Sequence, residues 1–209
     1  MKSDNLPVMG KWDVIVAPRS KLVHLNLYSV WLYRDLIFMF FKRDFIAFYK
    51  QTILGPLWYL IQPTLTAVTY FVIFSKVANI STNGLPPFVF YMSGIVLWTY
   101  FATCLTNNSE VFSKNAQIFG KVYFPRLVVP IAVVLSGMVA FLIQFGLLIL
   151  VSIGFWFAGA ELYLQWKGLL LAPILVFYVA CLGLGVGLVV SALTVRFRDL
   201  AFATGFFTQ

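Results

Sequence analysis

Residues 42–63 read KRDFIAFYKQTILGPLWYLIQP, where a basic, aromatic run passes into an apolar stretch almost without a spacer. Lys50 is the last charged residue before Lys76. A helix needs roughly 20 apolar residues to cross the hydrocarbon core of a bilayer. The junction therefore predicts a chain that enters a membrane directly after a basic segment on the membrane surface.

The composition of the whole chain supports a membrane protein. Hydrophobic residues make up 61% of the 209 residues and charged residues 11%, whereas a soluble domain carries about 25% charged residues. The formal net charge is +8. The basic residues flank the apolar runs, which favours membrane lipids as the partner and argues against nucleic acid. We expect an all-α, polytopic membrane protein.

Gaps between charged residues predict the membrane spans. We expect spans at 56–75, 88–108, 127–157 and 169–193, with a turn at 79–87 between the first two. The uncharged run from 200 to 209 is too short to cross a bilayer as a helix. We expect it to begin a fifth span, in a fragment or truncated form of a longer protein. The predicted domains are a cytoplasmic N-terminal segment, 1–51, and a transmembrane domain, 52–209.

The uncharged stretch 127–160 is long for one helix and short for two, and the charges decide between these. With one tilted or broken helix, basic residues fall on one side in groups of eight, three and two, which is 13 of the 15. Basic residues are enriched in cytoplasmic loops. We therefore expect one helix, with breaks at Pro130 and Gly137, and a cytoplasmic N-terminus.

Residues 28–50 contain neither proline nor glycine and are predicted to form a helix. Most of its aromatic residues lie opposite a face that carries Lys and Arg, a pattern typical of a helix lying in the interface plane of a membrane. Two interpretations stay open. The helix is either an anchor that only sets topology, or a gate that binds lipid headgroups at the cytoplasmic mouth of a pathway.

The sequence contains no pattern of an enzyme. It has no phosphate-binding loop, no pair of carboxylates within a span and no cluster of residues with metal-ligand spacing. All seven acidic residues lie at or outside the ends of the predicted spans, which argues against ion-coupled transport. We expect no catalytic residue, no metal site and no cofactor bound by this chain.

Three further patterns carry hypotheses. Most aromatic residues are expected in interfacial belts, but some can stack on sugar rings along a channel, and the candidates are Tyr70, Tyr91, Trp98 and Tyr100. The loop 110–126 is either a solvated connector or a docking element for a soluble partner. Gly183 and Gly187, four residues apart, predict close packing of two helices.

The order of these parts resembles the ABC-2-type transport permeases of polysaccharide exporters, which handle O-antigen, capsular polysaccharide or teichoic acid. The resemblance covers the chain from about residue 20 to its end. It rests on Arg43-Asp44, Tyr49-Lys50-Gln51-Thr52, Leu54-Gly55-Pro56-Leu57-Trp58, Gln62-Pro63, the segment 121–126 (KVYFPR), Ser191-Ala192-Leu193 and Arg196-Phe197-Arg198-Asp199-Leu200.

The resemblance implies a six-span subunit of the bacterial inner membrane that works as a homodimer with two copies of a cytoplasmic ATPase, which would bind ATP and Mg²⁺. It implies a gate for a polyprenyl-diphosphate-linked polysaccharide at Arg43, Tyr49 and Lys50. It also implies that the loop between spans two and three contacts the ATPase, through Glu110, Lys114, Asn115 and Lys121. The family's C-terminal part is missing here, which puts transport by this chain alone in doubt.

Three other functions remain as alternatives. Within the same class, the chain can be an ABC-2-type exporter of a drug or small lipid. It can also be a membrane anchor that holds a soluble complex and transports nothing. An integral-membrane enzyme acting on polyprenyl-linked sugars would need an acidic or metal site, and the sequence offers none.

Overall fold

The structure is a computed structural model that describes residues 27–50, 55–159, 166–197 and 199–209. Every regular element in these residues is helical, as predicted. The elements, in chain order, are α1 (Leu27–Leu32), α2 (Arg34–Lys50), η1 (Gly55–Leu57), α3 (Trp58–Tyr70), η2 (Phe71–Val77), α4 (Pro87–Ser109), α5 (Val111–Lys114), α6 (Ala116–Phe119), α7 (Val128–Phe157), α8 (Trp166–Thr194) and α9 (Asp199–Phe207).

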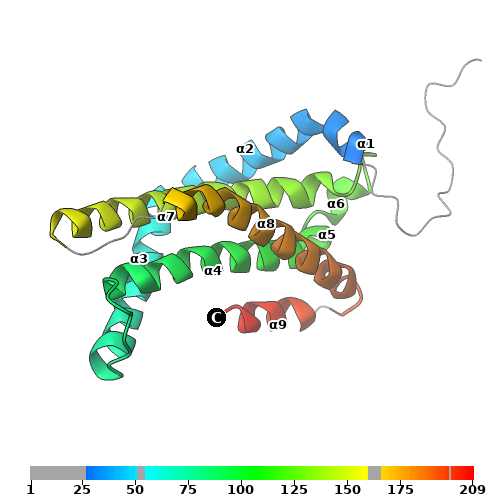
Figure 1. Cartoon of the computed structure of the whole chain (residues 1–209). Coiled ribbons are helices and arrows are strands. Elements are labelled where there is room, and N and C mark those ends of the chain that lie inside the picture. The colour runs from blue at the N-terminus through cyan, green and yellow to red at the C-terminus, as the bar shows by residue number, and fades with distance from the viewer. Residues whose placement is uncertain (1–26, 51–54, 160–165, 198) are drawn as a thin grey trace, which may run out of the picture.

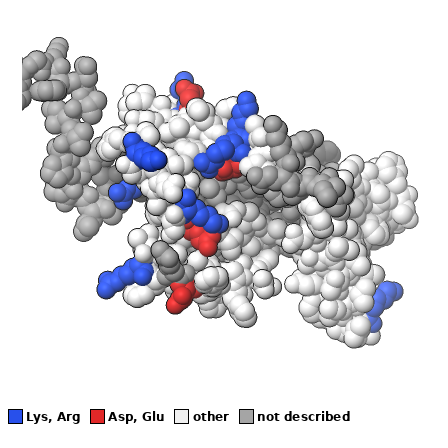
Figure 2. All heavy atoms as spheres, turned by 180° about the vertical axis from the view of Figure 1, so that it is seen from behind, with Lys and Arg blue, Asp and Glu red and all other residues white. Residues whose placement is uncertain are grey.

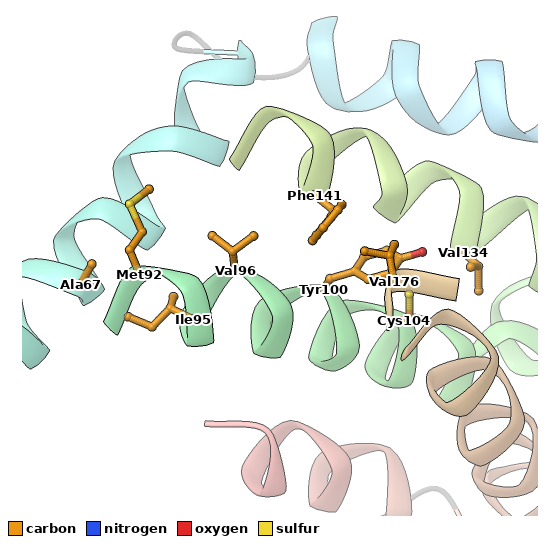
Figure 3. Packing of buried hydrophobic residues seen from close by; sticks show 9 residues of the cluster. All are labelled: Ala67, Met92, Ile95, Val96, Tyr100, Cys104, Val134, Phe141 and Val176. Atoms are coloured by element: carbon orange, nitrogen blue, oxygen red, sulfur yellow. The ribbon is translucent and has the colours of Figure 1, made fainter. Parts of the chain in front are cut away.

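Helix α4 lies at the centre of the arrangement. It packs against α3, α7, α8 and α9, and it runs in the opposite direction to α7 (Figure 1). Its buried side chains, among them Met92, Val96, Tyr100 and Cys104, form a core with Phe141 of α7 and Val176 of α8 (Figure 3). Within the residues that the structure describes, four helical segments are long and apolar enough to cross a membrane, namely Trp58–Val77, Pro87–Ser109, Val128–Phe157 and Leu170–Thr194.

The uncharged stretch 127–160 contains one continuous helix, α7, as the distribution of charges predicted. The predicted breaks within it were wrong. Pro130 lies in the first turn of α7, where the backbone N–H that proline lacks would have no intrahelical partner. Gly137 continues the helix and faces α4, where a Cβ atom would lie in ordinary van der Waals contact with Cε2 of Tyr100, at 3.5 Å.

The predicted N-terminal helix is interrupted once. Helices α1 and α2 are separated at Tyr33, whose N–H donates to the carbonyl of Val30, three residues back, at 3.1 Å. Helix α2 packs along the first half of α7 (Figure 1), and Phe40 is buried there beside Phe124. The in-plane orientation of this helix to a bilayer stays a prediction.

The glycine pair of α8 packs against α4, as predicted. A Cβ atom at Gly183 would lie 2.7 Å from Cβ of Cys104, and one at Gly187 would lie 2.6 Å from Cβ of Asn108. Real Cβ atoms essentially never approach so closely. The two glycines therefore permit the close contact between these helices, as small residues do in membrane proteins.

The charged side chains of the described residues gather towards one end of the molecule, while the opposite end carries little charge (Figure 2). The charged end includes the loop between α4 and α7, where Glu110, Lys114, Lys121 and Arg126 lie. This separation matches the polarity expected of a membrane protein with one basic side.

Candidate functional site

A cavity of about 510 Å³ lies among α2, α3, α4, α5 and α7. Its volume is within the range of small-molecule binding sites. Because α4 and α7 run in opposite directions, the first lining residue of α7, Val133, lies near the loop that carries Lys114. Gln144, eleven residues further along α7, lies at the far end, about 16 Å away along the helix axis.

Among the described residues, two basic side chains line the cavity, each beside one carboxylate. The guanidinium of Arg43 contacts Oδ1 of Asp44 at 2.8 Å and lies 4.8 Å from the ring centre of Phe40. The Nζ atom of Lys114 lies 2.5 Å from Oε2 of Glu110, one helical turn away. The side chains of Arg43 and Lys114 are 47% and 64% exposed. Ion pairs at such exposure are weak, so both cations remain available to an anionic ligand.

The rest of the polar lining is uncharged and comes from α3, α4, α7 and the turn after α5. It includes Gln62, Thr66, Thr99, Thr103, Asn107, Asn115, Ser136 and Gln144. Aromatic rings border these groups. Tyr100 of α4 and Phe141 of α7 meet with ring centres 5.1 Å apart (Figure 3), and Trp58 and Tyr59 of α3 complete the aromatic part of the lining.

Four residues predicted from the sequence meet at this cavity. Arg43, Lys114, Asn115 and Tyr100 all line it, although they come from three different helices and the turn after α5. The predicted phosphate-binding residue thus lies in the same cavity as two predicted ATPase-contacting residues.

Other predicted residues lie elsewhere. Tyr49 and Lys50 end helix α2, and their side chains lie outside the described part of the chain. Tyr70 packs edge-on to Phe74, and Tyr91 packs on the core around α4. Nε1 of Trp98 donates to the carbonyl of Thr208 at 3.2 Å. None of the last three lines the cavity.

The loop after α4 forms two single-turn helices, α5 and α6, rather than one amphipathic helix. Its residue Asn115 donates a hydrogen bond from Nδ2 to the carbonyl of Val111 at 2.9 Å. Lys121, which follows α6, is exposed, while Glu110 at the start of the loop is part-buried and pairs with Lys114. The short helices keep the polar residues of the loop at the surface and at the cavity.

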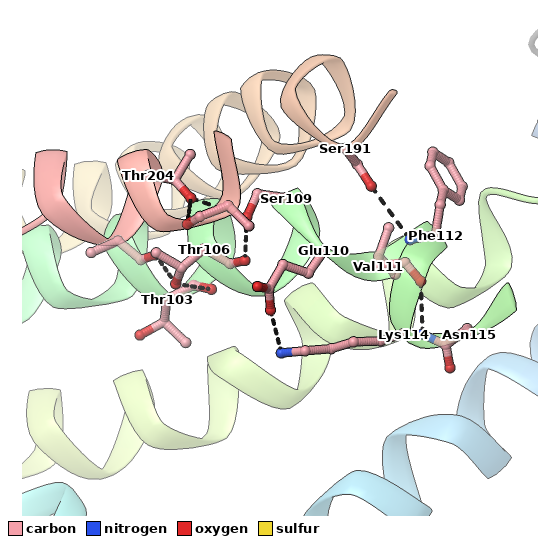
Figure 4. A network of polar contacts seen from close by, with 12 residues as sticks. Thr103, Thr106, Ser109, Glu110, Val111, Phe112, Lys114, Asn115, Ser191 and Thr204 are labelled. Atoms are coloured by element: carbon pink, nitrogen blue, oxygen red, sulfur yellow. Dashed lines mark hydrogen bonds and ion pairs between the residues drawn. The ribbon is translucent and has the colours of Figure 1, made fainter. Parts of the chain in front are cut away.

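Hydrogen bonds and close contacts link this loop to the later helices (Figure 4). The backbone N–H of Phe112 lies 3.4 Å from Oγ of Ser191 on α8. The hydroxyls of Ser109, at the end of α4, and Thr204, on α9, lie 3.2 Å apart. These contacts join α5 to α8 and the end of α4 to α9.

Sequence reasoning missed Gln144, a residue of α7 that is 4% exposed and lines the cavity. A signal was present, because Gln144 is the only amide in the uncharged stretch 127–160. Thr204 was also missed. It lies in the uncharged run 200–209, for which the sequence predicted only the beginning of a membrane span.

These features define a multi-pass membrane protein with a polar cavity between its helices. The model of the family described as "ABC-2 type transporter" matches residues 35–209. The chain therefore belongs to the ABC-2 type transporter family.

Individual proteins of known name are also similar to this chain. The chain is 32% identical over 167 residues to "O-antigen export system permease protein RfbA" of Klebsiella pneumoniae, a match that covers 79% of this chain and 61% of that protein. It is 27% identical over 175 residues to the protein of the same name from Myxococcus xanthus, covering 82% of this chain and 63% of that protein. The chain thus spans about three-fifths of the length of these relatives.

Proposed function

We propose that this chain is the permease subunit of an ABC transporter that exports a lipid-linked polysaccharide, of the O-antigen, capsule or teichoic-acid kind, across the bacterial inner membrane. It works as a homodimer with its N-terminus in the cytoplasm. ATP hydrolysis takes place on two copies of a separate ATPase subunit. The names of the bacterial relatives support the substrate class.

The observation that carries the proposal is the mixed lining of one cavity. Arg43 and Lys114 supply cations, and the other walls supply neutral hydroxyls, amides and aromatic rings. A ligand that combines a diphosphate with hydroxylated rings matches both kinds of lining. Arg43 can bind a phosphate through two N–H groups, while Lys114 acts as a point charge.

The separate ATPase follows from what the chain provides. This sequence has no phosphate-binding loop, and the proposal therefore assigns ATP binding to a partner subunit. The segment Glu110–Lys121 offers exposed polar residues next to the cavity, and its helix α5 contacts α8. ATPase movement at this segment would reach both the cavity lining at Lys114 and the later helices.

The alternatives are less well supported. An apolar cavity of about 700 Å³ also lies among α1, α2 and α7, so the preference rests on the polar cavity, whose described lining includes two cations and several hydroxyls and amides. A simple anchor gives no reason for buried polar groups between spans. The relatives' names also favour a saccharide over a drug or small lipid.

A crosslinking experiment tests the ATPase contact. A photo-crosslinking amino acid in place of Lys121, introduced into the complete permease in cells, should form a covalent product with an ATPase that carries a Walker motif. Lys121 is exposed and follows α6 directly. Mass spectrometry of the crosslinked product identifies the partner.

The matched control carries the same amino acid at Lys76, which is also exposed but lies in η2, at the C-terminal end of the first span. This position is expected on the opposite side of the membrane and should give no ATPase product. An ATPase crosslink from position 76 would contradict the proposed contact, and so would the absence of an ATPase crosslink from both positions.

A further inference from the structure

Gln144 has an unmet hydrogen-bonding capacity in the middle of an apolar helix. Its Oε1 atom is buried and accepts no hydrogen bond from the described residues. The other two polar side chains in the central part of α7 bond to their own helix. Ser136 donates to the carbonyl of Ala132 at 3.0 Å, and Ser152 donates to that of Leu148 at 2.8 Å. A buried, unpaired amide destabilises a fold, so it calls for an explanation.

The cavity supplies that explanation, since Gln144 lies in its wall. Tyr100 also lines this cavity and is 2% exposed. Figure 3 shows Tyr100 and Phe141 pointing toward one another between α4 and α7. The unpaired amide oxygen of Gln144 and the aromatic pair of Tyr100 and Phe141 therefore line one cavity.

The neighbouring groups are uncharged. Thr99 and Thr103 come from α4, and Thr66 from α3, where its hydroxyl donates to the carbonyl of Gln62 at 3.0 Å. The oxygen of Thr66 can still accept a hydrogen bond. Asp44 of α2 is the one acidic lining residue in the described part of the chain, and it pairs with Arg43.

The chemistry of this lining selects a class of ligand group. An acyl chain would leave the amide of Gln144 unpaired, and a carboxylated sugar would meet no cation on this wall. A neutral sugar ring fits, because its hydroxyls both donate and accept, and its apolar face can lie on an aromatic ring. An amide can bind two neighbouring hydroxyls, since it offers one acceptor and two donors.

We propose that the wall formed by Gln144 and Tyr100 binds an uncharged sugar ring of the transported molecule, with the Gln144 amide hydrogen-bonded to its hydroxyls. This inference rests on the proposed function and adds which part of the substrate this wall recognises. The diphosphate lies toward Arg43 and Lys114, on the other walls of the same cavity.

The test uses the complete permease purified with its ATPase and reconstituted in liposomes. Two probes are compared, a polyprenyl diphosphate and the same carrier bearing one neutral hexose. ATPase stimulation is measured against the concentration of each. We expect the hexose to lower the half-maximal concentration about tenfold, which corresponds to ~1.4 kcal/mol of binding free energy.

The variant Gln144→Met removes the amide at similar length. It should abolish the difference between the two carriers and keep the melting temperature at or above that of the unmodified protein, because it removes an unpaired buried amide oxygen. The matched control is Ser152→Ala, on the same helix and outside the cavity, which should retain the advantage.

The outcomes separate the two proposals. A full hexose advantage in Gln144→Met, or no advantage in the unmodified protein, would overturn the sugar-binding wall while leaving the permease function standing. The first result would indicate that Gln144 contacts only water. If neither carrier stimulates ATP hydrolysis by the unmodified complex, the proposed function itself fails.

Discussion

Replacing Arg43 with glutamine should reduce export of the surface polysaccharide at least tenfold while leaving membrane insertion unchanged. Arg43 is one of two cations that line the cavity, and its guanidinium can hold a phosphate through two hydrogen bonds. A charge-assisted hydrogen bond contributes roughly 1.5–3 kcal/mol, and 1.4 kcal/mol is a factor of ten. Surface polysaccharide is measured by gel electrophoresis, and insertion by the amount of permease in the membrane fraction.

The matched control is Lys42→Gln. Lys42 precedes Arg43 on α2, is exposed and does not line the cavity. It changes the net charge of the helix by the same amount, so it should retain most of the export. The double variant Arg43→Gln and Lys50→Gln should export least. Normal surface polysaccharide in the double variant would refute the phosphate gate.

Replacing Gly187 with valine should strongly reduce the amount of folded protein. Even the Cβ atom of the new side chain would lie 2.6 Å from Cβ of Asn108 and 3.2 Å from the carbonyl oxygen of Leu105. Overpacking a well-packed contact costs about 1–3 kcal/mol and sometimes more, a large share of a typical folding free energy. The melting temperature of the purified protein and its abundance in the membrane measure the effect.

The control for this variant is two residues away on the same helix. A Cβ atom at Gly185 would meet no atom within 4 Å, so Gly185→Val should fold nearly as well as the unmodified protein. Equal melting temperatures for the two valine variants would show that α4 and α8 do not pack as described.

The membrane spans could be predicted because their signal is local. Charges cannot lie in the hydrocarbon core at low cost, so gaps between charges bounded the helices to within a few residues. The count of basic residues also resolved 127–160 into one helix, which the structure forms as α7. Proline and glycine were less informative. Pro130 lies in the first turn of α7 and Gly137 at a packing contact, so neither interrupts the helix.

The side chains that meet at the cavity were harder to predict, because helices α4 and α7 are apolar nearly all round. A helix whose surface is hydrophobic on every side gives no periodic signal for the face that points inward. Tyr91, Trp98 and Tyr100 therefore looked equivalent in the sequence, whereas only Tyr100 lines the cavity. Gln144 could have been noticed as the single side-chain amide in 127–160. The residues of α3 and α4 that line the cavity with it could not be predicted, because they come together only through packing between distant segments.

Export by a purified complex tests the central claim most directly. The complete permease and its ATPase would be reconstituted in liposomes with a polyprenyl-diphosphate-linked oligosaccharide that starts on the side of the ATPase. After ATP is added, the fraction of saccharide that a glycosidase on the opposite side can cleave is measured over time. We expect this fraction to rise with ATP and to stay at background with a non-hydrolysable ATP analogue. An equal fraction with and without ATP hydrolysis would contradict the proposal that this chain is part of an ATP-driven polysaccharide exporter.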